Sequence, residues 1–295
     1  MLFSTKYLDL AYKLLSNKSY AICRNLKIAY EIINCTFTFN VIDCNVNIYS
    51  CYKSKSLPIN YVIAEFVWIM LRSDSLSISN FNKQMVNFSD DNEILHGAYG
   101  ARIGSQIESI LNLLLKDEHS RRAIIQIYSK IDTLYYLDSK DIPCNTSLQF
   151  LIRKNTLFMI VTARSIDFIT GLSIDAIQWQ FLYLLIYNQL KLTYSNLSVG
   201  LIHYNIGSLH VYDNQIDVNI LEAINDTSNF KDYMLKLNFT YSSLYNILSK
   251  DYSNHYNLMN TVELFTINFS TLGDNASVLY CIKQDFFKRI YRVIR

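Results

Sequence analysis

The sequence has few of the residues that interrupt regular structure. Glycine occurs 7 times and proline 2 times in 295 residues, and no Pro-, Gly- or Ser-rich stretch or internal repeat divides the chain. Because 51% of the residues are hydrophobic, a chain of this length can bury a large core. We therefore expect one domain over residues 1–295, without a linker between independent parts.

The sequence also lacks a membrane-spanning stretch and a cleavable signal. Its longest apolar segments, around Trp68 and over 181–187, are interrupted by Arg72 and by Asn188. The first residues lead directly into an amphipathic pattern, which is not how a secretory signal begins. These absences predict a cytoplasmic protein without a membrane partner.

Clustered charge and paired cysteines are absent as well. The formal net charge is +2 and no block of like charges occurs, so we expect no nucleic-acid partner, and any anion must be held locally. No CxxC spacing suggests a metal site, and a reducing compartment gives no reason for disulfides. The cysteines are therefore interpreted as free thiols: Cys23, Cys35, Cys44, Cys51, Cys144 and Cys281.

Hydrophobic periodicity predicts an irregular mixture of helices and strands. Helical spacing of apolar residues is found over 7–15, 60–71, 106–115 and 175–190. Strand patterns occupy 27–41, 123–128, 148–153, 157–163, 233–241 and 262–269, and the chain closes with a basic helical pattern over 286–295. Such a mixture favours an α+β fold over a regular βαβ array.

Cys144 is the first candidate for chemistry. It directly follows Pro143, and Arg164 lies on the next apolar segment. A thiol attacks as its thiolate, and its ordinary pKa of about 8.5 leaves little thiolate at neutral pH unless a cation is near. Arg164 is a candidate for that cation. From this segment alone, a small buried hydrophobic cysteine is an equally good interpretation.

Arginines next to apolar strands are the second signal. Arg121 and Arg122 stand directly before the strand predicted over 123–128, and Arg164 with Ser165 ends another strand. A guanidinium buried without an anion is costly, and its planar fork matches phosphate oxygens. Each arginine taken alone is equally well interpreted as a surface residue that flanks a strand.

Several motifs in register resemble the thymidylate synthase superfamily. They cover about residues 5–215 and are Ser120-Arg121-Arg122, Pro143-Cys144 with Gln149-Phe150, Arg164-Ser165 with Asp167, Gly171-Leu172 before Asp175, and Gly207-Ser208-Leu209-His210-Val211-Tyr212. The resemblance implies a thymidylate synthase fold of the α+β class, with a large mixed β-sheet flanked by helices. It also implies a homodimer formed through the sheet. Residues 216–295 are expected to be a divergent C-terminal elaboration of this core.

The resemblance assigns catalytic roles to four residues. Cys144 would add to C6 of a pyrimidine nucleoside monophosphate, which makes C5 nucleophilic toward the one-carbon unit of 5,10-methylenetetrahydrofolate. Arg164 would stand beside this cysteine. Glu65, on a helix with Trp68, would exchange protons through water. Tyr99, in a Tyr-Gly pair with Gly100, would lie near the C5 proton that must leave.

The resemblance also assigns ligand contacts, and it indicates no metal. Arg24, Arg164 and Ser165 would hold the 5′-phosphate, and Arg121 and Arg122 would reach the same phosphate from the second subunit.

Four further residues would contact the rest of the ligands. His210 and Tyr212 would bind the 3′-hydroxyl. Asp167 would contact the folate ring, and Lys55 matches a lysine on the folate side.

Asp175 is the expected base-selecting residue. Synthases have an asparagine at this position, whose amide complements N3-H and O4 of uracil. A protonated or proton-sharing aspartate complements N3 and the C4 amino group of cytosine, and uracil would leave buried polar atoms unmatched. Asn145, in place of the usual histidine, agrees with this choice, as does the Gly207-Ser208 form of the ribose motif, which resembles the deoxycytidylate hydroxymethylases. The alternative role for Asp175 is an N-cap of the helix that follows it.

The sequence therefore predicts an enzyme that hydroxymethylates dCMP at C5. Its C-terminal residues do not resemble the apolar tail that closes over the folate in synthases, and a different closure admits water to the one-carbon intermediate. The alternatives are a thymidylate synthase acting on dUMP or a relative that modifies CMP or UMP. A catalytically retired nucleotide-binding protein is an alternative of a different class.

Overall fold

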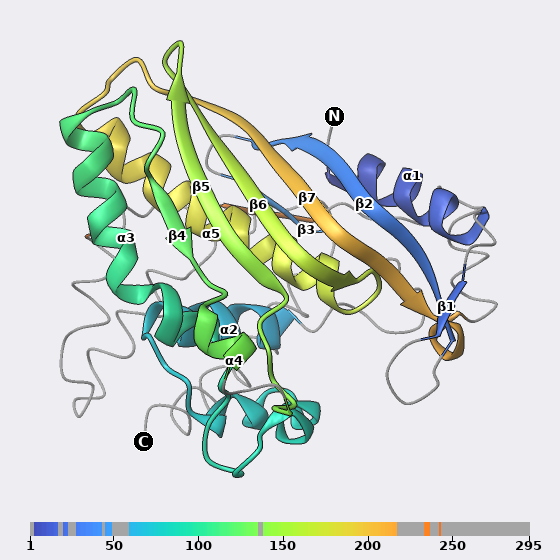
Figure 1. The fold of residues 1–295 in the computed structure, drawn as a ribbon. Helices are drawn as coiled ribbons and strands as arrows, with labels where there is room; N and C mark the ends of the chain where they lie inside the picture. The colour runs from blue at the N-terminus through green and yellow to red at the C-terminus, as the bar shows by residue number, and fades with distance from the viewer. Residues whose placement is uncertain are drawn as a thin grey trace, which may run out of the picture.

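A computed structural model describes residues 3–16, 20–22, 28–42, 45–48, 59–134, 138–216, 233–236 and 242. Figure 1 shows the elements in this part of the chain. They are, in order, α1 (Phe3–Ser16), β1 (Tyr20–Ile22), β2 (Ile28–Asn40), β3 (Asn45–Ile48), α2 (Ile59–Met70), η2 (Leu76–Asn80), η3 (Lys83–Phe88), α3 (Tyr99–Lys116), β4 (Ile124–Gln126), α4 (Lys130–Leu134), β5 (Asn145–Arg153), β6 (Thr156–Asp167), α5 (Gly171–Lys191), β7 (Ser198–Tyr212), η4 (Asp213–Gln215) and β8 (Tyr233–Lys236).

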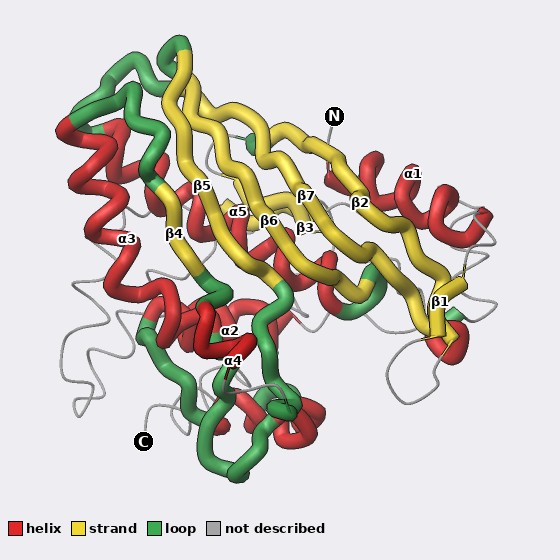
Figure 2. Tube along the Cα trace, viewed as in Figure 1, coloured by secondary structure: helices red, strands yellow, loops and turns green. Residues whose placement is uncertain are grey.

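A mixed sheet forms the centre of the fold. Six strands lie in the order β1-β2-β7-β6-β5-β4, in which β6 and β7 are parallel and every other pair is antiparallel. A separate pair joins β3 to β8. In Figures 1 and 2 the helix α5 passes behind the sheet, and α1 lies beside β2. This architecture confirms the predicted α+β class and the mixed sheet flanked by helices.

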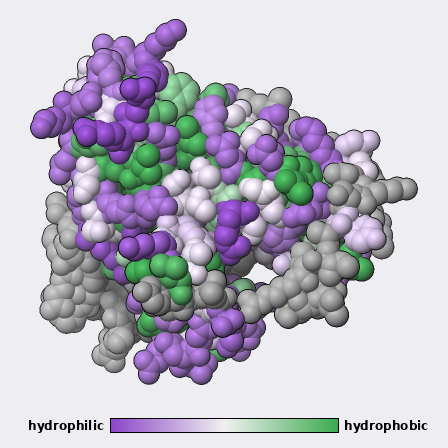
Figure 3. Space-filling model, in the orientation of Figure 1, coloured by the Kyte–Doolittle hydropathy of each residue, from purple (hydrophilic) through white to green (hydrophobic). Residues whose placement is uncertain are grey.

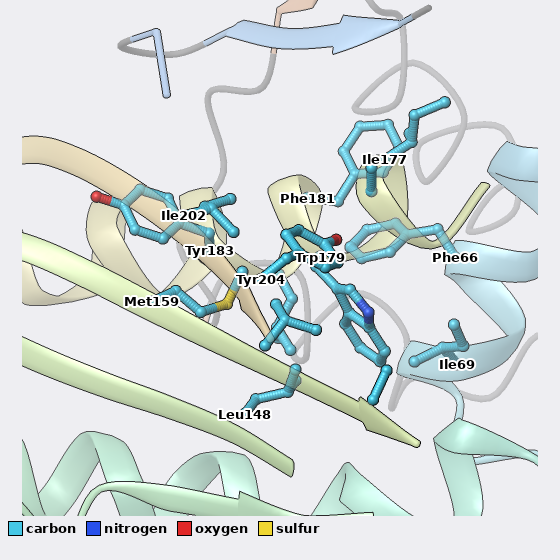
Figure 4. Packing of buried hydrophobic residues seen from close by; sticks show 14 of the residues in the cluster. Phe66, Ile69, Leu148, Met159, Ile177, Trp179, Phe181, Tyr183, Ile202 and Tyr204 are labelled. Carbon is cyan, nitrogen blue, oxygen red and sulfur yellow. The ribbon is translucent and has the colours of Figure 1, made fainter. Parts of the chain in front are cut away.

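The core lies between the sheet and the helices α5 and α2. Almost every residue of α5 from Leu172 to Tyr187 is buried, as expected for a helix that is apolar on all sides. Figure 4 shows side chains of α5 and α2 meeting those of the strands, and the rings of Phe66 and Phe181 pack with centroids 4.7 Å apart. Within the described part of the chain, no helix combines the length and apolarity needed to cross a bilayer.

In β6 and β7 the alternation of buried and exposed side chains shifts by one residue at neighbouring positions, close to Cys144. In β6 the buried positions run 157, 159, 161 and 163 and then resume at Ile166, and in β7 they run 202, 204 and 206 and resume at Leu209. Arg164 and Gly207 occupy the level of the change, and Asn34 of β2 has a φ of 55° there. A Cβ on Gly207 would stand 2.6 Å from the carbonyl oxygen of Arg164, so only glycine permits this approach.

Several element boundaries differ from the sequence predictions. The helix expected over 106–115 begins at Tyr99, because Gly100 packs against the backbone of Ile69 rather than breaking the helix. Strand β6 continues to Asp167, four residues past its predicted end. No strand was predicted where the long strand β7 lies. The strand predicted over 233–241 is seen at Tyr233–Lys236. The predicted elements over 262–269 and 286–295 lie outside the described residues.

One arginine with no predicted role, Arg102, is held by several partners within the described part of the chain. Arg102 of α3 donates to both carboxylate oxygens of Asp132 at 2.7 Å, and it also donates to the carbonyl oxygens of His96 and Ile127. The Asp132 side chain is inaccessible to solvent. Because every partner is supplied by the protein, this guanidinium holds the first turns of α3, and thereby Tyr99, against the loop before β5.

Candidate functional site

The loop that carries Cys144 is held by Arg164. The guanidinium donates from Nε to the carbonyl oxygen of Pro143 (3.0 Å) and from Nη2 to that of Ile142 (2.9 Å). The same Nη2 lies 3.8 Å from Sγ of Cys144, and the Arg164 amide donates to the Cys144 carbonyl. The structure therefore brings the predicted nucleophile and the predicted cation together. Ser165, next along β6, accepts from Arg164 at 3.4 Å.

The pKa of the Cys144 thiol is set by opposing effects. Desolvation raises this pKa above its ordinary value and is the largest effect, and Arg164 lowers it. The negative charge of Asp175 raises it, and a hydrogen bond with Ser165 lowers it. The sequence argument that Arg164 favours the thiolate is right in direction, but it left out the larger cost of desolvation.

Asn145 joins the nucleophile loop to two other predicted site residues. Its side-chain Nδ2 donates to Oη of Tyr99 and to Oδ2 of Asp175, both at 2.7 Å. Asn145 is 0% exposed, and its Oδ1 has no hydrogen-bond partner among the described residues. The carboxylate can only accept, which fixes the amide with its NH2 group toward Asp175. The amide carbonyl is left as a buried acceptor that still needs a donor.

Asp175 lies inside α5, not at its beginning. The helix starts at Gly171 with Thr170 as its N-cap residue, so the alternative role of Asp175 as an N-cap is wrong. Desolvation raises the pKa of the Asp175 carboxyl to about 7, and the hydrogen bond from Asn145 opposes that shift. Near neutral pH this carboxyl is therefore populated in both its neutral and its ionised form.

Glu65 of α2 is held by two donors. Tyr61 donates from its hydroxyl to Oε1 (2.7 Å), and Gln178 of α5 donates from Nε2 to Oε2 (2.9 Å). Desolvation raises the pKa of Glu65 to about 7, the charge of Asp175 raises it further, and the two hydrogen bonds lower it. A carboxyl with a pKa near neutrality can both give and take a proton, as the predicted role requires.

Tyr61 and Gln178 are the site residues that sequence reasoning missed. Tyr61 stands one turn before Glu65 on α2, and Gln178 stands one turn after Asp175 on α5, where it is 1% exposed. One sequence signal could have identified them. Each is a polar residue in a mostly apolar helix, and each lies one helical turn from a predicted site residue. Composition alone could not separate Gln178 from its neighbour Gln180, which is equally buried.

The structure does not bring Arg121 and Arg122 to Cys144 of the same subunit. Arg121 and Arg122 are exposed just before β4, and in the described part of the chain neither side chain makes a hydrogen bond or an ion pair. The backbone carbonyl of Arg121 accepts from Gln149 of β5. Arg24, expected at the phosphate, and Lys55, expected at the folate, lie outside the described residues.

Asp167, His210 and Tyr212 lie at adjoining ends of β6 and β7. Asp167 and His210 are neighbours in the strand register, and the rings of His210 and Tyr212 meet edge-on with centroids 5.1 Å apart. Oδ1 of Asp167 accepts from the amides of Ile169 and Thr170, at 2.9 and 2.7 Å.

The other carboxylate oxygen of Asp167 keeps capacity for a ligand. Oδ2 accepts one hydrogen bond, from Nε2 of Gln215 at 2.9 Å. A carboxylate oxygen accepts about two hydrogen bonds, so this atom can take one more donor.

The arrangement combines a nucleophile with two acid-base groups. Cys144, Glu65, Tyr99 and Asp175 are all partly exposed, so a ligand can reach them. A thiol beside a guanidinium and two carboxyls with pKa values of about 7 can add to an electrophilic carbon and move protons around it.

The amino-acid sequence was compared with known protein families and proteins. A family model described as thymidylate synthase matches residues 5–264. A deoxyuridylate hydroxymethyltransferase of Bacillus phage SP01 is 29% identical over 188 residues, which is 58% of this chain and 48% of that protein. A protein of the same name from Delftia phage PhiW-14 is 33% identical over 135 residues, or 41% of this chain and 38% of its own length.

A bacterial relative aligns over more of its length. The thymidylate synthase of Clostridium beijerinckii is 23% identical over 266 residues, which covers 86% of this chain and 96% of that synthase. The chain thus spans about half or less of the two phage proteins, but nearly the whole of the synthase.

Proposed function

The chain belongs to the thymidylate synthase family, and we propose that it transfers a hydroxymethyl group to C5 of the pyrimidine ring of dCMP. Two observations support the reaction class: Cys144 lies beside Arg164, and the relatives carry the names of C5-modifying enzymes. The observation that carries the choice of base is the Asp175–Asn145 pair.

The one-carbon donor of this family is methylenetetrahydrofolate, which supplies a carbon at the oxidation level of formaldehyde. The described residues fit such a ligand, because Oδ2 of Asp167 keeps an acceptor position that an N-H of the pterin ring can use. Lys55 is expected to contribute on the same side.

Cys144 begins the reaction by adding to C6 of the pyrimidine. Arg164 stabilises the thiolate and, through the carbonyl groups of Ile142 and Pro143, fixes where the sulfur points. Addition at C6 pushes electrons to C5, which then bonds the one-carbon unit. Tyr99 accepts a hydrogen bond from Asn145, which orients its hydroxyl group for its part in moving the C5 proton that must leave.

Hydroxymethyl is the product when water captures the carbon attached to C5. Before that capture, the C5 proton would leave by way of Tyr99, and the bond between the carbon and the folate nitrogen would break, with the proton and the electron pair ending on the released tetrahydrofolate. C5 then carries a methylene group, and the water oxygen bonds its carbon while one water proton moves to the carboxylate of Glu65. The methylene π electrons form the C5–C6 double bond, and the C6–S bond breaks to release the Cys144 thiolate. The sum is dCMP plus one CH2O unit, with tetrahydrofolate released. The name shared by the two phage relatives supports this outcome over methylation.

Cytosine is favoured by the acceptor left on Asn145. A neutral Asp175 can donate to N3 of cytosine, and its other oxygen can accept from the C4 amino group. That amino group carries a second hydrogen, which matches the unpartnered Oδ1 of Asn145. Oxygen O4 of uracil has only lone pairs, so it would face the Asn145 carbonyl without supplying the donor that this buried carbonyl needs.

Hydroxymethylation of dUMP is the second candidate, because two relatives are named for deoxyuridylate. A neutral Asp175 can also accept from N3-H of uracil and donate to O4. Thymidylate synthesis from dUMP is the third candidate, supported by the name of the bacterial relative.

The phosphate site and the dimer belong to the same proposal. Arg164 and Ser165 hold the 5′-phosphate together with Arg24, while His210 and Tyr212 bind the 3′-hydroxyl. Arg121 and Arg122 reach the phosphate of a second subunit, which pairs through the exposed face of the sheet. That face carries Ile33, which is 76% exposed, and Figure 3 shows apolar patches between polar side chains over this side of the molecule.

Product analysis tests the proposal. Purified protein is incubated with methylenetetrahydrofolate and with dCMP, CMP, dUMP or UMP in separate reactions, and each nucleotide is then weighed by mass spectrometry. We expect dCMP to gain one CH2O unit. A gain of one CH2 unit on dUMP with release of dihydrofolate identifies a synthase, and binding of every nucleotide without turnover identifies a protein that has lost catalysis.

A further inference from the structure

Gln178 has an amide whose orientation is fixed by its surroundings. Both hydrogens of Nε2 are used: one is donated to Oε2 of Glu65 and the other to the backbone carbonyl of Val62, each at 2.9 Å. A carboxylate and a carbonyl only accept, so the amide cannot be turned over. The oxygen Oε1 must therefore point away from these two atoms.

That oxygen is a buried acceptor in need of a donor. Gln178 is 1% exposed, and its Oε1 makes no hydrogen bond with any described residue. Leaving a buried amide oxygen unpaired costs free energy, so such atoms are normally satisfied by protein, water or ligand. Here the protein uses the NH2 end of the side chain and leaves the carbonyl end available.

The position of Gln178 ties it to both carboxyls of the site. It lies one helical turn from Asp175 on α5, so the two side chains share a face of that helix. It bonds Glu65 directly, and the charges of Glu65 and Asp175 act on each other. The Gln178 amide is therefore next to the carboxyl that is proposed to exchange protons with water.

We propose that Gln178 is a positioning residue for the water that captures the one-carbon unit, holding Glu65 with its NH2 group and accepting one water hydrogen at Oε1. This inference rests on the proposed hydroxymethylation. With one hydrogen on Gln178 and the other on Glu65, the water oxygen keeps a lone pair for attack.

The step balances with the groups named. The oxygen lone pair forms the new C–O bond, the hydrogen shared with Glu65 moves to its carboxylate as a proton, and Gln178 keeps its neutral amide. The displaced electrons return through C5 and leave as the Cys144 thiolate. No oxidant or reductant is consumed, which distinguishes this capture from methylation, where a hydride is required.

Two methionine variants provide the test and its matched control. Gln178→Met keeps the length of the side chain and removes both its donor and its acceptor. Gln180→Met makes the same change two residues away, at an equally buried amide that donates to the carbonyl of Ala176. We expect Gln178→Met to lower kcat for hydroxymethyl-dCMP on the order of 100-fold, with KM for dCMP changed less than about threefold. Gln180→Met should keep the wild-type kcat.

A spectroscopic readout separates this role from a general loss of structure. The carboxyl of Glu65 is titrated by infrared difference spectroscopy without any folate, using Glu65→Gln to assign its band. Because the Gln178 hydrogen bond lowers the pKa of Glu65, Gln178→Met should raise that pKa, whereas Gln180→Met should leave it unchanged. Equal dCMP affinity in the three proteins confirms that the nucleotide site is intact.

Gln178→Glu supplies a rescue. A protonated carboxyl keeps one of the two amide donors, for Glu65, and an acceptor at its carbonyl oxygen, so kcat should recover in part relative to Gln178→Met at pH 6 and fall again by pH 8. Wild-type kcat and an unchanged Glu65 pKa in Gln178→Met would overturn the role of Gln178 alone. A wild-type protein that makes no hydroxymethyl nucleotide would instead overturn the proposed function, and the water-positioning role with it.

Discussion

The side-chain amide of Asn145 donates a 2.7 Å hydrogen bond to Oδ2 of Asp175. Asn145 follows the nucleophile in the sequence, while Asp175 lies on the long central helix. The same amide nitrogen donates to the Tyr99 hydroxyl, so one side chain orients both the proposed base-selecting carboxyl and the group expected near C5. In the proposed reaction, recognition of the base and movement of its C5 proton therefore depend on one hydrogen-bonded unit.

Replacement of Asp175 tests the base selector. Asp175→Asn restores an amide that can accept from N3-H and donate to O4 of uracil, so the ratio of kcat/KM for dCMP over dUMP should fall by about 100-fold or more. The ratio is measured with both nucleotides under saturating folate. Asp138→Asn removes an exposed charge elsewhere and should leave the ratio unchanged. An unchanged ratio in Asp175→Asn would remove this residue from the selector role.

The affinity for dCMP should depend on pH. The pair of cytosine and Asp175 shares one proton, and the pKa of free Asp175 is about 7. Above pH 7 that proton must be taken up on binding, so the Kd of dCMP should weaken about tenfold per pH unit. The 5′-phosphate completes its second ionisation near pH 6 and does not contribute in this range. Equilibrium dialysis from pH 7 to 9 measures the slope, and a flat profile for wild type contradicts the shared proton.

Loss of the thiol should stop chemistry at C5. Cys144→Ser removes the nucleophile that adds to C6, so release of tritium from [5-³H]dCMP should fall below detection. Cys35→Ser changes a buried thiol on β2 and serves as the control, with tritium release kept. Tritium release by Cys144→Ser would show that Cys144 is not the nucleophile.

Glu65 should destabilise the protein at neutral and alkaline pH. Its pKa rises from 4.5 in the unfolded chain to about 7 in the fold, so between these values the folded state binds more protons and stability falls as pH rises. Glu65→Gln removes this dependence, and its free energy of unfolding should exceed that of wild type above pH 7 by at most about 3 kcal/mol. Urea denaturation at pH 8 and at pH 4.5 compares the two proteins. The advantage should disappear at the lower pH, and an advantage that is equal at both would contradict the assigned pKa.

Gly207 should be required where β6 and β7 change face. An added Cβ would stand 2.6 Å from the Arg164 carbonyl oxygen, so Gly207→Ala should cost about 1 to 3 kcal/mol of stability and displace the arginine beside Cys144. In Gly171→Ala the new methyl meets its nearest neighbour at 3.4 Å, and little effect is expected. Chemical denaturation measures both. Equal stability of the two variants would contradict this prediction and show that β6 and β7 can move apart to accommodate the methyl group.

The sequence named several residues that the structure brings together, because they lie in contiguous motifs. Cys144 with Arg164, Asn145 with Asp175 and the Glu65 helix all come together in the fold. Periodicity also located α2 and α5, since an apolar run long enough for a helix is hard to mistake for a strand. The α+β class followed from the irregular order of these patterns.

What the sequence could not give depends on packing between distant segments. The hydrogen bond from Gln178 to Glu65 joins residues that are 113 positions apart, and no local sequence pattern indicates it. Desolvation of Cys144 outweighs Arg164 only because the surrounding segments withhold water. Periodicity placed the start of α3 at residue 106, because the close contact of Gly100 with the backbone of Ile69 leaves no local pattern in the sequence.

A competition assay tests the central claim most directly. Equimolar dCMP and dUMP are mixed with the protein and methylenetetrahydrofolate, and the early products are quantified together by mass spectrometry. We expect hydroxymethyl-dCMP to predominate over every uracil product by about 100-fold or more, on the scale at which a buried hydrogen-bonding site rejects a mismatched base. A predominance of hydroxymethyl-dUMP or of dTMP would contradict it.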